Sequence, residues 1–217
     1  MAEETRNYSI FQTDVRKTTE GEGPFLEELK SALWKKRALD PEGVYRSNLS
    51  GTWHSKDDVL STCGPAATTL ADMLFREFKS YAGNFVSETG GSIELRLTAW
   101  CMMYGKGGYA TVHTHPNCHF SGVYYVDVGP EVEDAVMATG VSVKPGSIEF
   151  VDTRGTGSLQ VPGLNLSSAA RFAPKNGEML IFPSWLPHFV HPIATDYTRI
   201  AIACNASILR YTPPKKE

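Results

Sequence analysis

Five of the six histidines in this chain of 217 residues lie in two short windows, residues 113–119 and 188–191. Neutral imidazole is the most common metal ligand among protein side chains. The two windows are separated by residues 120–187, so they predict a metal site that is assembled from distant segments of the chain. A metal site is a hypothesis about the chemical function of the protein as well as about its fold.

In the first window, His113 and His115 are separated by one residue. On a β-strand such residues point to the same face and lie about 6.5–7 Å apart, so both rings could reach one ion. Two histidines on a solvent-exposed strand would show the same spacing. The first window alone therefore does not decide between a metal site and a polar strand face.

In the second window, His188 follows an apolar segment, residues 177–183, which we expect to be a buried strand ending at a proline-bounded corner. A histidine that opens the next strand at such a corner would lie at the mouth of a barrel, where small ligands bind. His191 has the opposite strand parity and is expected outside the ligand set. The predicted metal ligands are therefore His113, His115 and His188.

Arg199 lies in an apolar run that follows the second window. We expect residues 188–193 to pair with 198–205 as a hairpin, so that His188, Arg199 and Asn205 share the inner face. Arg199 would then lie about 13 Å along the strand from His188, a distance that an extended arginine and a five-carbon dicarboxylate would fill. Arginine suits bidentate carboxylate binding in a dry pocket. The less favoured alternative is an arginine paired with an internal acid.

Three other polar residues could replace His115 as a metal ligand if its side chain turned away from the site. They are His119, Glu149 and Asp152. His54 is expected to be structural.

Two helices are predicted ahead of these segments. One begins at Pro24, a residue suited to the first helical turn, and ends before Asp40. The other covers roughly residues 65–84 and has an apolar stripe made of Leu70, Met73, Leu74, Phe78 and Tyr81. An edge strand is expected over residues 8–15, and residues 47–55 are expected to lie in a loop.

After Gly90 the sequence becomes rich in strand patterns. Alternating or apolar runs cover residues 92–103, 109–115, 120–128, 147–152, 178–183, 188–193 and 199–208. They predict a mainly β fold, an antiparallel sandwich or barrel with helices supporting one face. Residues 152–175 are expected to form a long functional loop. We expect one domain over residues 1–217, with a helical part at about 20–85 and a β core at about 92–208.

Composition and charge argue against several classes of partner. The net charge of −3 gives no general attraction to nucleic acid or to anionic membranes. No apolar run reaches about eighteen residues, and the N-terminus has no signal-peptide pattern. The four cysteines are widely spaced, as expected for reduced thiols of a cytoplasmic protein. A homodimer is left open.

Three motifs carry a family resemblance. They are Ser47-Asn48-Leu49-Ser50-Gly51-Thr52-Trp53, His113-Thr114-His115-Pro116-Asn117-Cys118-His119-Phe120-Ser121-Gly122-Val123-Tyr124-Tyr125 and Phe182-Pro183-Ser184-Trp185-Leu186-Pro187-His188-Phe189-Val190-His191-Pro192. Together they resemble the Fe(II)/2-oxoglutarate-dependent oxygenases, and more closely a 2-oxoglutarate/iron oxygenase family found largely in bacteria and phages. The two histidine segments are specific. The first motif is the loosest match because Thr52 is an extra residue.

The resemblance implies a double-stranded β-helix (jelly-roll) core with supporting N-terminal helices. It implies that His113 and His188 bind Fe(II), with His115 at a position that is usually a carboxylate. Three neutral ligands would leave the site with a charge of +2 rather than +1. It also implies that Arg199 binds the distal carboxylate of 2-oxoglutarate. The remaining implied contacts are Tyr125 and Ser121 as supporting cofactor residues and Asn205 on the pocket floor.

The predicted function is therefore an Fe(II)- and 2-oxoglutarate-dependent oxygenase that consumes O2 and hydroxylates an unidentified substrate. No catalytic side chain is expected beyond the metal centre. One alternative is a three-histidine, cupin-like metalloenzyme that does not use 2-oxoglutarate, in which Arg199 is structural. Another is a non-catalytic jelly roll that binds a metal or a small acid. Three histidines also match catalytic zinc, so Fe and Zn both stay open.

Overall fold

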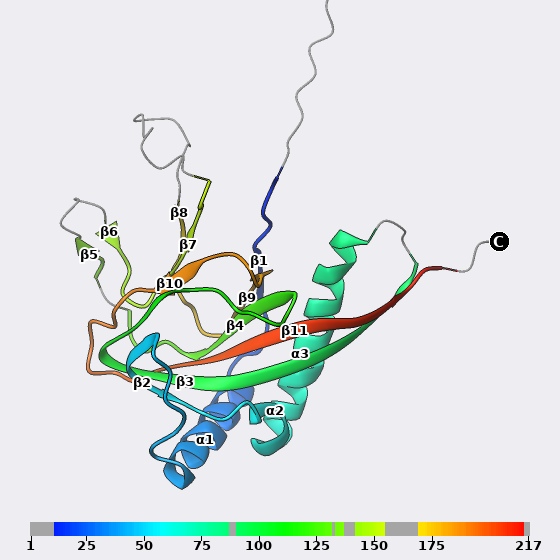
Figure 1. The fold of residues 1–217 in the computed structure, drawn as a ribbon. Helices are drawn as coiled ribbons and strands as arrows, with labels where there is room; N and C mark the ends of the chain where they lie inside the picture. Colours follow the sequence, from blue (N-terminus) through cyan, green and yellow to red (C-terminus); the bar gives the residue numbers. More distant parts are fainter. Residues whose placement is uncertain (1–10, 87–89, 132, 137–141, 155–168, 215–217) are drawn as a thin grey trace, which may run out of the picture.

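The computed structural model describes residues 11–86, 90–131, 133–136, 142–154 and 169–214. Two long strands, β3 (Ser92–His113) and β11 (Arg199–Thr212), run side by side across the molecule (Figure 1). The helices α1 (Pro24–Leu39) and α3 (Gly64–Ala82) lie on one side of this pair. Two short helical segments, α2 (Val59–Thr62) and η1 (Gly83–Phe85), flank α3.

Both predicted helices are confirmed. Pro24 occupies the first turn of α1, and the helix ends at Leu39, one residue before Asp40. In α3 the whole predicted apolar stripe is buried, and it packs on the sheet in the largest hydrophobic cluster. The periodicity of 3.6 residues therefore identified both the helix and the face that it buries.

A curled antiparallel sheet of nine strands is the main element of the described structure. Its strand order is β1-β9-β4-β11-β3-β10-β7-β8, with β2 beside β3. The further strands are β1 (Arg16–Thr19), β2 (Leu49–His54), β4 (Phe120–Asp127), β7 (Ile148–Val151), β8 (Ala169–Phe172), β9 (Glu178–Pro183) and β10 (His188–Val190). A separate small sheet pairs β5 (Ala135–Val136) with β6 (Ser142–Val143). The mainly β fold with N-terminal supporting helices is as expected.

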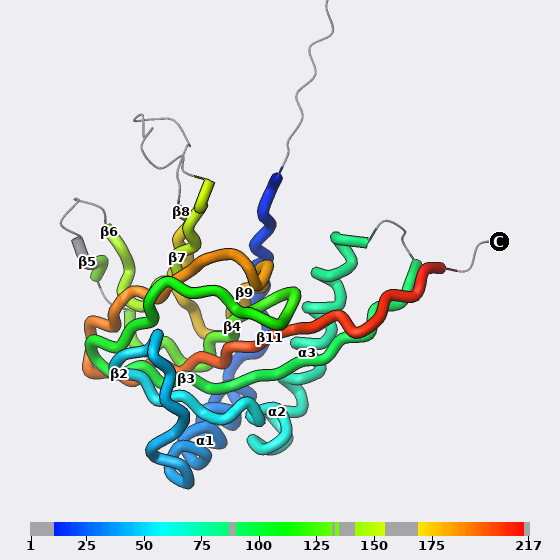
Figure 2. The backbone as a smooth tube through the Cα atoms, viewed as in Figure 1, coloured from blue at the N-terminus to red at the C-terminus, as the bar shows by residue number. Residues whose placement is uncertain are grey.

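The curl of the sheet comes from a bend within β3. Up to Tyr104, which pairs with Arg199, β3 runs beside β11. After the bend it pairs with β10, where His113 lies opposite His188. Glycine is required at the bend, because a Cβ atom on Gly108 would lie 2.7 Å from the carbonyl oxygen of Gly51. The bend carries β10 and β7 back over the rest of the sheet (Figure 2).

The curled sheet separates two hydrophobic clusters. The helices cover its outer face, where Leu70, Phe78 and other helical residues pack against alternate residues of the long strands. On the inner face, Val123 and Tyr125 of β4 pack in one cluster with Ile148 and Phe150 of β7. Residues of alternating parity on β4 and β11 thus face either the helices or the interior of the curl.

The predicted hairpin between residues 188–193 and 198–205 is wrong. β10 ends at Val190 and pairs with β3 and β7, whereas β11 pairs with β3 and β4. Both edges of each strand are therefore occupied. The backbone N–H of Ile193 donates to the carbonyl of Gly108 (3.0 Å), so the chain after β10 follows the bend of β3 instead of turning back on itself.

Several predicted boundaries also change. Within the expected edge strand 8–15, residues 8–10 lie outside the described residues and residues 11–15 are not a strand, because pairing with β9 begins at Arg16. The loop expected over residues 47–55 contains β2. The runs 92–103 and 109–115 fall mostly on one strand, β3.

The expected long loop, 152–175, contains strand β8, which pairs with β7. Residues 155–168 of that segment lie outside the described residues. Among the helices that the structure describes, none is long and apolar enough to cross a membrane.

Candidate metal centre

The three predicted metal ligands come together at the point where β3 meets β10. His113 and His188 are direct partners in the sheet. The backbone N–H of His115 donates to the carbonyl of Ser184 (2.9 Å), which holds the segment after β3 beside the segment that leads into β10. One ligand atom from each of the three histidines lies within 4.8 Å of the other two.

Backbone carbonyls orient two of these rings. Nδ1 of His113 lies 2.7 Å from the carbonyl oxygen of Thr111, and Nδ1 of His188 lies 2.9 Å from that of Leu186. Because a carbonyl oxygen only accepts, each Nδ1 carries the proton and each Nε2 keeps its lone pair. This arrangement is typical of imidazoles that bind a metal through Nε2.

The spacing of the ligand atoms fits a single small cation. Nε2 of His115 lies 3.3 Å from Nε2 of His188. Two nitrogen atoms that are each about 2.1 Å from one ion, at an angle of about 100°, would lie about 3.2 Å apart. Without a metal the same spacing suits a hydrogen bond between the rings. The donor set therefore fits Fe(II) or Zn(II), both of which accept imidazole ligands.

Burial keeps these histidines neutral. It lowers the pKa of His188 to about 3 and that of His115 to about 4, with the neighbouring His113 adding to both shifts. The pKa of His113 is lowered by burial as well. The three imidazoles are therefore deprotonated at neutral pH without a metal, so an incoming cation has almost no protons to displace.

We predict that metal affinity depends only weakly on pH. Three exposed histidines with ordinary pKa values near 6.5 would lose about a thousandfold in affinity between pH 7.5 and pH 5.5, because each would have to release a proton. Since the pKa values here are lowered, we expect a loss of less than tenfold over that range. Competition with a chromophoric chelator for Zn(II) at several pH values measures this directly. A steep loss below pH 6.5 would contradict the prediction.

Aromatic rings enclose the histidine cluster. The rings of Phe182 and Phe150 lie 4.7 and 5.8 Å from that of His188, centroid to centroid, and Trp100 lies 5.9 Å from His115. The cluster opens into a cavity of about 590 Å³. This volume is in the range of small-molecule sites.

Arg199, Tyr125 and Asn205 line the same cavity as the three histidines. Ser121 is not among the residues that line it. Its hydroxyl donates to Oδ1 of Asn205 (2.9 Å), so Ser121 acts on the cavity through Asn205. That hydrogen bond leaves the Asn205 amide nitrogen free to donate to a ligand.

Arg199 is a buried cation without a counter-ion in the described structure. Its side chain is sandwiched between two rings, with the guanidinium carbon 4.9 Å from the centroid of Tyr104 and 5.0 Å from that of Tyr125. Nε and Nη1 of Arg199 and the hydroxyl of Tyr125 are buried and have no hydrogen-bond partner among the described residues. Buried groups of this kind are costly unless a ligand satisfies them.

The phenol beside Arg199 is a hydrogen-bond donor. Burial raises the pKa of Tyr125, although the Arg199 cation opposes that shift. The hydroxyl therefore stays protonated at neutral pH. Arg199 and Tyr125 together present N–H and O–H donors for which the described structure offers no acceptor. A bound carboxylate would accept hydrogen bonds from both residues.

The reserve ligands do not join the cluster. Glu149 accepts hydrogen bonds from Nε of Arg171 (2.5 Å) and Nε2 of His191 (2.7 Å). His119 accepts from the backbone N–H of Ile208 (3.1 Å). Asp152 forms a local, exposed pair with the guanidinium of Arg154 (2.7 Å). His191 lies outside the cluster, as expected, although it follows the end of β10 and is not itself on the strand.

Several residues that line the cavity were missed in the sequence or given another role, among them His54, Trp100, Met102 and Tyr104. Trp100, Met102 and Tyr104 alternate along β3 and so share its inner face. This alternation was present in the sequence, but apolar residues on a strand do not distinguish a packed core from a ligand cavity. His54, which was expected to be structural, also lines the cavity.

Comparisons with known proteins agree with this geometry. Residues 98–205 match a protein family described as "Putative 2OG-Fe(II) oxygenase". No curated protein matches the sequence. The matched segment contains all three histidines of the cluster as well as Arg199 and Tyr125.

Solved structures share the fold. A prolyl-4-hydroxylase from Pseudomonas putida superposes with a TM-score of 0.57 at 15% identity, covering 93% of each chain. A prolyl hydroxylase from Trichoplax adhaerens gives 0.59 at 13% identity, covering 89% of this chain and 83% of the other. HygX from Streptomyces hygroscopicus, solved with nickel and 2-oxoglutarate bound, gives 0.55 at 13% identity, covering 93% and 83%.

Proposed function

We propose that this chain binds iron through His113, His115 and His188 and hydroxylates a substrate at that centre. Its residues 98–205 match the 2OG-Fe(II) oxygenase family. The observation that carries the assignment of a co-substrate site is Arg199. A buried guanidinium with unpaired donors opens into the same cavity as three neutral histidines. A metal alone would not satisfy that guanidinium, whereas a metal-binding dicarboxylate would.

In this proposal each residue has a defined task. Arg199 and Tyr125 bind the distal carboxylate of 2-oxoglutarate, and the keto acid end extends toward the histidine cluster. When bound, Fe(II) and 2-oxoglutarate supply the oxidising power. One oxygen atom of O2 enters succinate, which forms together with CO2, and the other is inserted into a C–H bond of the substrate. Phe150 and Phe182 keep the side of His188 away from water.

Ser121 and Asn205 take a supporting role. The family resemblance implies Ser121 as a supporting co-substrate contact and Asn205 on the pocket floor. The hydrogen bond between them favours Ser121 as the residue that orients the Asn205 amide, and Asn205 as the one that faces a ligand.

The remaining expectations are also proposals. The four cysteines are unpaired, which supports a reducing, cytoplasmic location. We propose a single oxygenase domain that acts on a substrate separate from 2-oxoglutarate. A homodimer stays a prediction, and light scattering in solution distinguishes it from a monomer.

Anaerobic reconstitution with Fe(II) followed by titration with 2-oxoglutarate tests the proposed function. We expect one equivalent of iron and a visible charge-transfer band that saturates with one equivalent of 2-oxoglutarate. Iron binding without the band, and without thermal stabilisation by 2-oxoglutarate, would favour the cupin-like alternative. A saturable band without succinate formation in air, across a broad substrate panel, would favour the non-catalytic alternative.

A further inference from the structure

The cavity has two chemically different ends, and the proposed function uses only one of them. Arg199, Ala203 and Asn205 all line it, and they follow one another along the inner face of β11. Arg199 and Asn205 are separated by about 20 Å measured along an extended strand. A co-substrate anchored at Arg199 reaches the histidines but leaves the end near Asn205 free.

An aromatic wall forms the free end. The rings of His54 and Trp100 are stacked with centroids 5.7 Å apart and an interplanar angle of 17°. Trp100 in turn lies next to His115, so the wall begins beside the proposed metal ligands. Nδ1 of His54 lies 2.6 Å from the carbonyl oxygen of Ser55 and so carries the proton. Its Nε2 is left as a hydrogen-bond acceptor.

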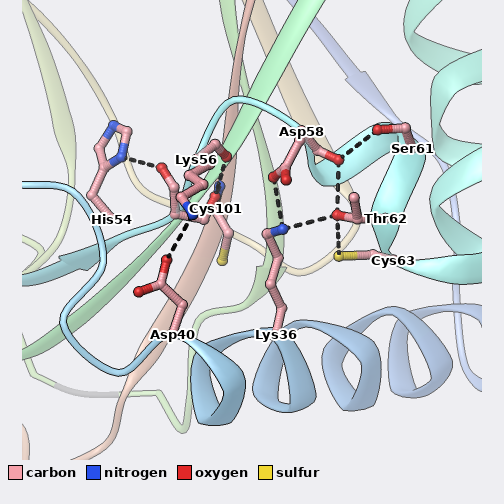
Figure 3. A network of polar contacts seen from close by, with 10 residues as sticks. Lys36, Asp40, His54, Lys56, Asp58, Ser61, Thr62, Cys63 and Cys101 are labelled. Carbon is pink, nitrogen blue, oxygen red and sulfur yellow. Dashed lines mark hydrogen bonds and ion pairs between the residues drawn. The ribbon is translucent and has the colours of Figure 1, made fainter.

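The segment that carries His54 is fixed against β3 (Figure 3). The backbone N–H of Ser55 donates to the carbonyl of Cys101, and the N–H of Cys101 donates to Oγ of Ser55, both at 2.9 Å. Asp58 forms a β-bridge with Ala99 and an ion pair with Lys36 of α1 (2.6 Å). The turn after β2 is therefore held in place before any ligand arrives.

Two opposite charges lie near His54: burial lowers the pKa of His54, Arg46 lowers it further and Asp57 raises it. Arg46 and Asp57 both line the cavity, with Nη2 of Arg46 3.9 Å from Oδ1 of Asp57. Their side chains are 44% and 52% exposed. This pair is too long for a hydrogen bond, and half-exposed pairs contribute little to stability. Both charges are therefore available to a ligand at little cost.

We propose that this end binds the primary substrate and that the substrate is a small, amino-acid-like zwitterion. Arg46 binds its carboxylate and Asp57 its ammonium group. Its carbon chain packs on Trp100, beside the histidine cluster. Nε2 of His54 accepts a hydrogen bond from a polar group of the substrate. The inference rests on the proposed function, since it places the substrate next to iron and 2-oxoglutarate.

The test uses the Fe(II)- and 2-oxoglutarate-loaded protein and the twenty common L-amino acids as probes. Binding is followed anaerobically through the charge-transfer band, and succinate formation is followed in air. For at least one amino acid we expect a tenfold or greater increase in succinate formation. The matching amine without the carboxylate, and the matching acid without the ammonium group, should bind at least tenfold more weakly.

Variants at the two charges connect this selectivity to the structure. Arg46→Gln and Asp57→Asn should each raise the KM for the amino acid at least tenfold, and leave the 2-oxoglutarate titration unchanged within twofold. Lys56→Gln, a neighbouring exposed charge, serves as the matched control and should change neither quantity.

Three outcomes would overturn the inference while the 2-oxoglutarate band is present. They are no amino acid binding, binding of a peptide panel in its place, and unchanged KM values in both charge variants. Absence of the band in the wild-type protein is a different failure, because it rejects the proposed function itself.

Discussion

Replacing His188 with alanine is expected to reduce metal affinity at least a hundredfold and to abolish oxidation of 2-oxoglutarate. Structural zinc sites with four ligands bind with about 10–16 kcal/mol, so one ligand contributes about 3 kcal/mol, or about a hundredfold. His188 is buried and its ring packs against those of Phe150 and Phe182, neither of which offers a replacement ligand atom. Iron stoichiometry after anaerobic reconstitution and succinate release in air measure both effects.

The matched control is His119→Ala. His119 belongs to the same sequence window, is exposed and lies outside the cluster. We expect it to keep full iron binding and activity. Because His188→Ala leaves a cavity in a packed site, thermal unfolding without metal should be compared for both variants, and His113→Ala provides a second, less buried test. One equivalent of tightly bound iron in His188→Ala or His113→Ala would contradict the assignment.

The helices and most strands could be predicted from the sequence because their signals are local. A stripe such as Leu70, Leu74 and Phe78 requires only a helix and one apolar surface to pack on. The three histidines were also predicted from a local rule, strand parity, and they do lie together. The rule itself applies only in part, because β3 ends at His113 and β10 ends at Val190, so His115 and His191 lie just outside the strands. These inferences needed no knowledge of which strands are neighbours.

Strand pairing could not be predicted in the same way. The expected hairpin joined β10 and β11 because they are close in sequence, whereas β3 lies between them in the sheet. Pairing over long sequence separation depends on the bend in β3, and the glycines at 105, 107 and 108 did not indicate its direction. Arg199 reaches the cavity through its pairing with Tyr104, and the residue was identified correctly as cavity-lining from an incorrect register.

The interior of the cavity was equally hidden. Trp100 and Tyr104 alternate on β3 as core residues do, and nothing in their types indicates that they line a cavity rather than a packed core. The opposite is true of Arg199, because an arginine in an apolar run is costly to bury without a function. Polar residues in apolar contexts thus predicted several side chains that line the cavity, whereas its apolar walls were found only in the structure.

Replacing Arg199 with methionine is expected to have opposite effects on stability without and with 2-oxoglutarate. Methionine fills a similar space without burying an unpaired charge, and replacing even a paired buried charge by apolar residues is often neutral or stabilising by about 1–4 kcal/mol. The cation–π contacts with Tyr104 and Tyr125 offset about 1–2 kcal/mol of this gain, so we expect a net gain of about 1 kcal/mol. Affinity for 2-oxoglutarate should fall at least a hundredfold, while iron binding is kept. Thermal unfolding with and without 2-oxoglutarate measures both effects.

The sign of the stability change separates a ligand-binding arginine from a structural one. A ligand at a hundred times its Kd stabilises a protein by about 2.7 kcal/mol. Without 2-oxoglutarate the wild-type protein should therefore be less stable than Arg199→Met, and with 2-oxoglutarate it should be more stable than Arg199→Met. Arg171→Met is the matched control, because Arg171 is paired with Glu149. It should lose stability and keep its response to 2-oxoglutarate. If Arg199→Met behaved like Arg171→Met, Arg199 would be a structural residue, and the cupin-like alternative would account for the three histidines.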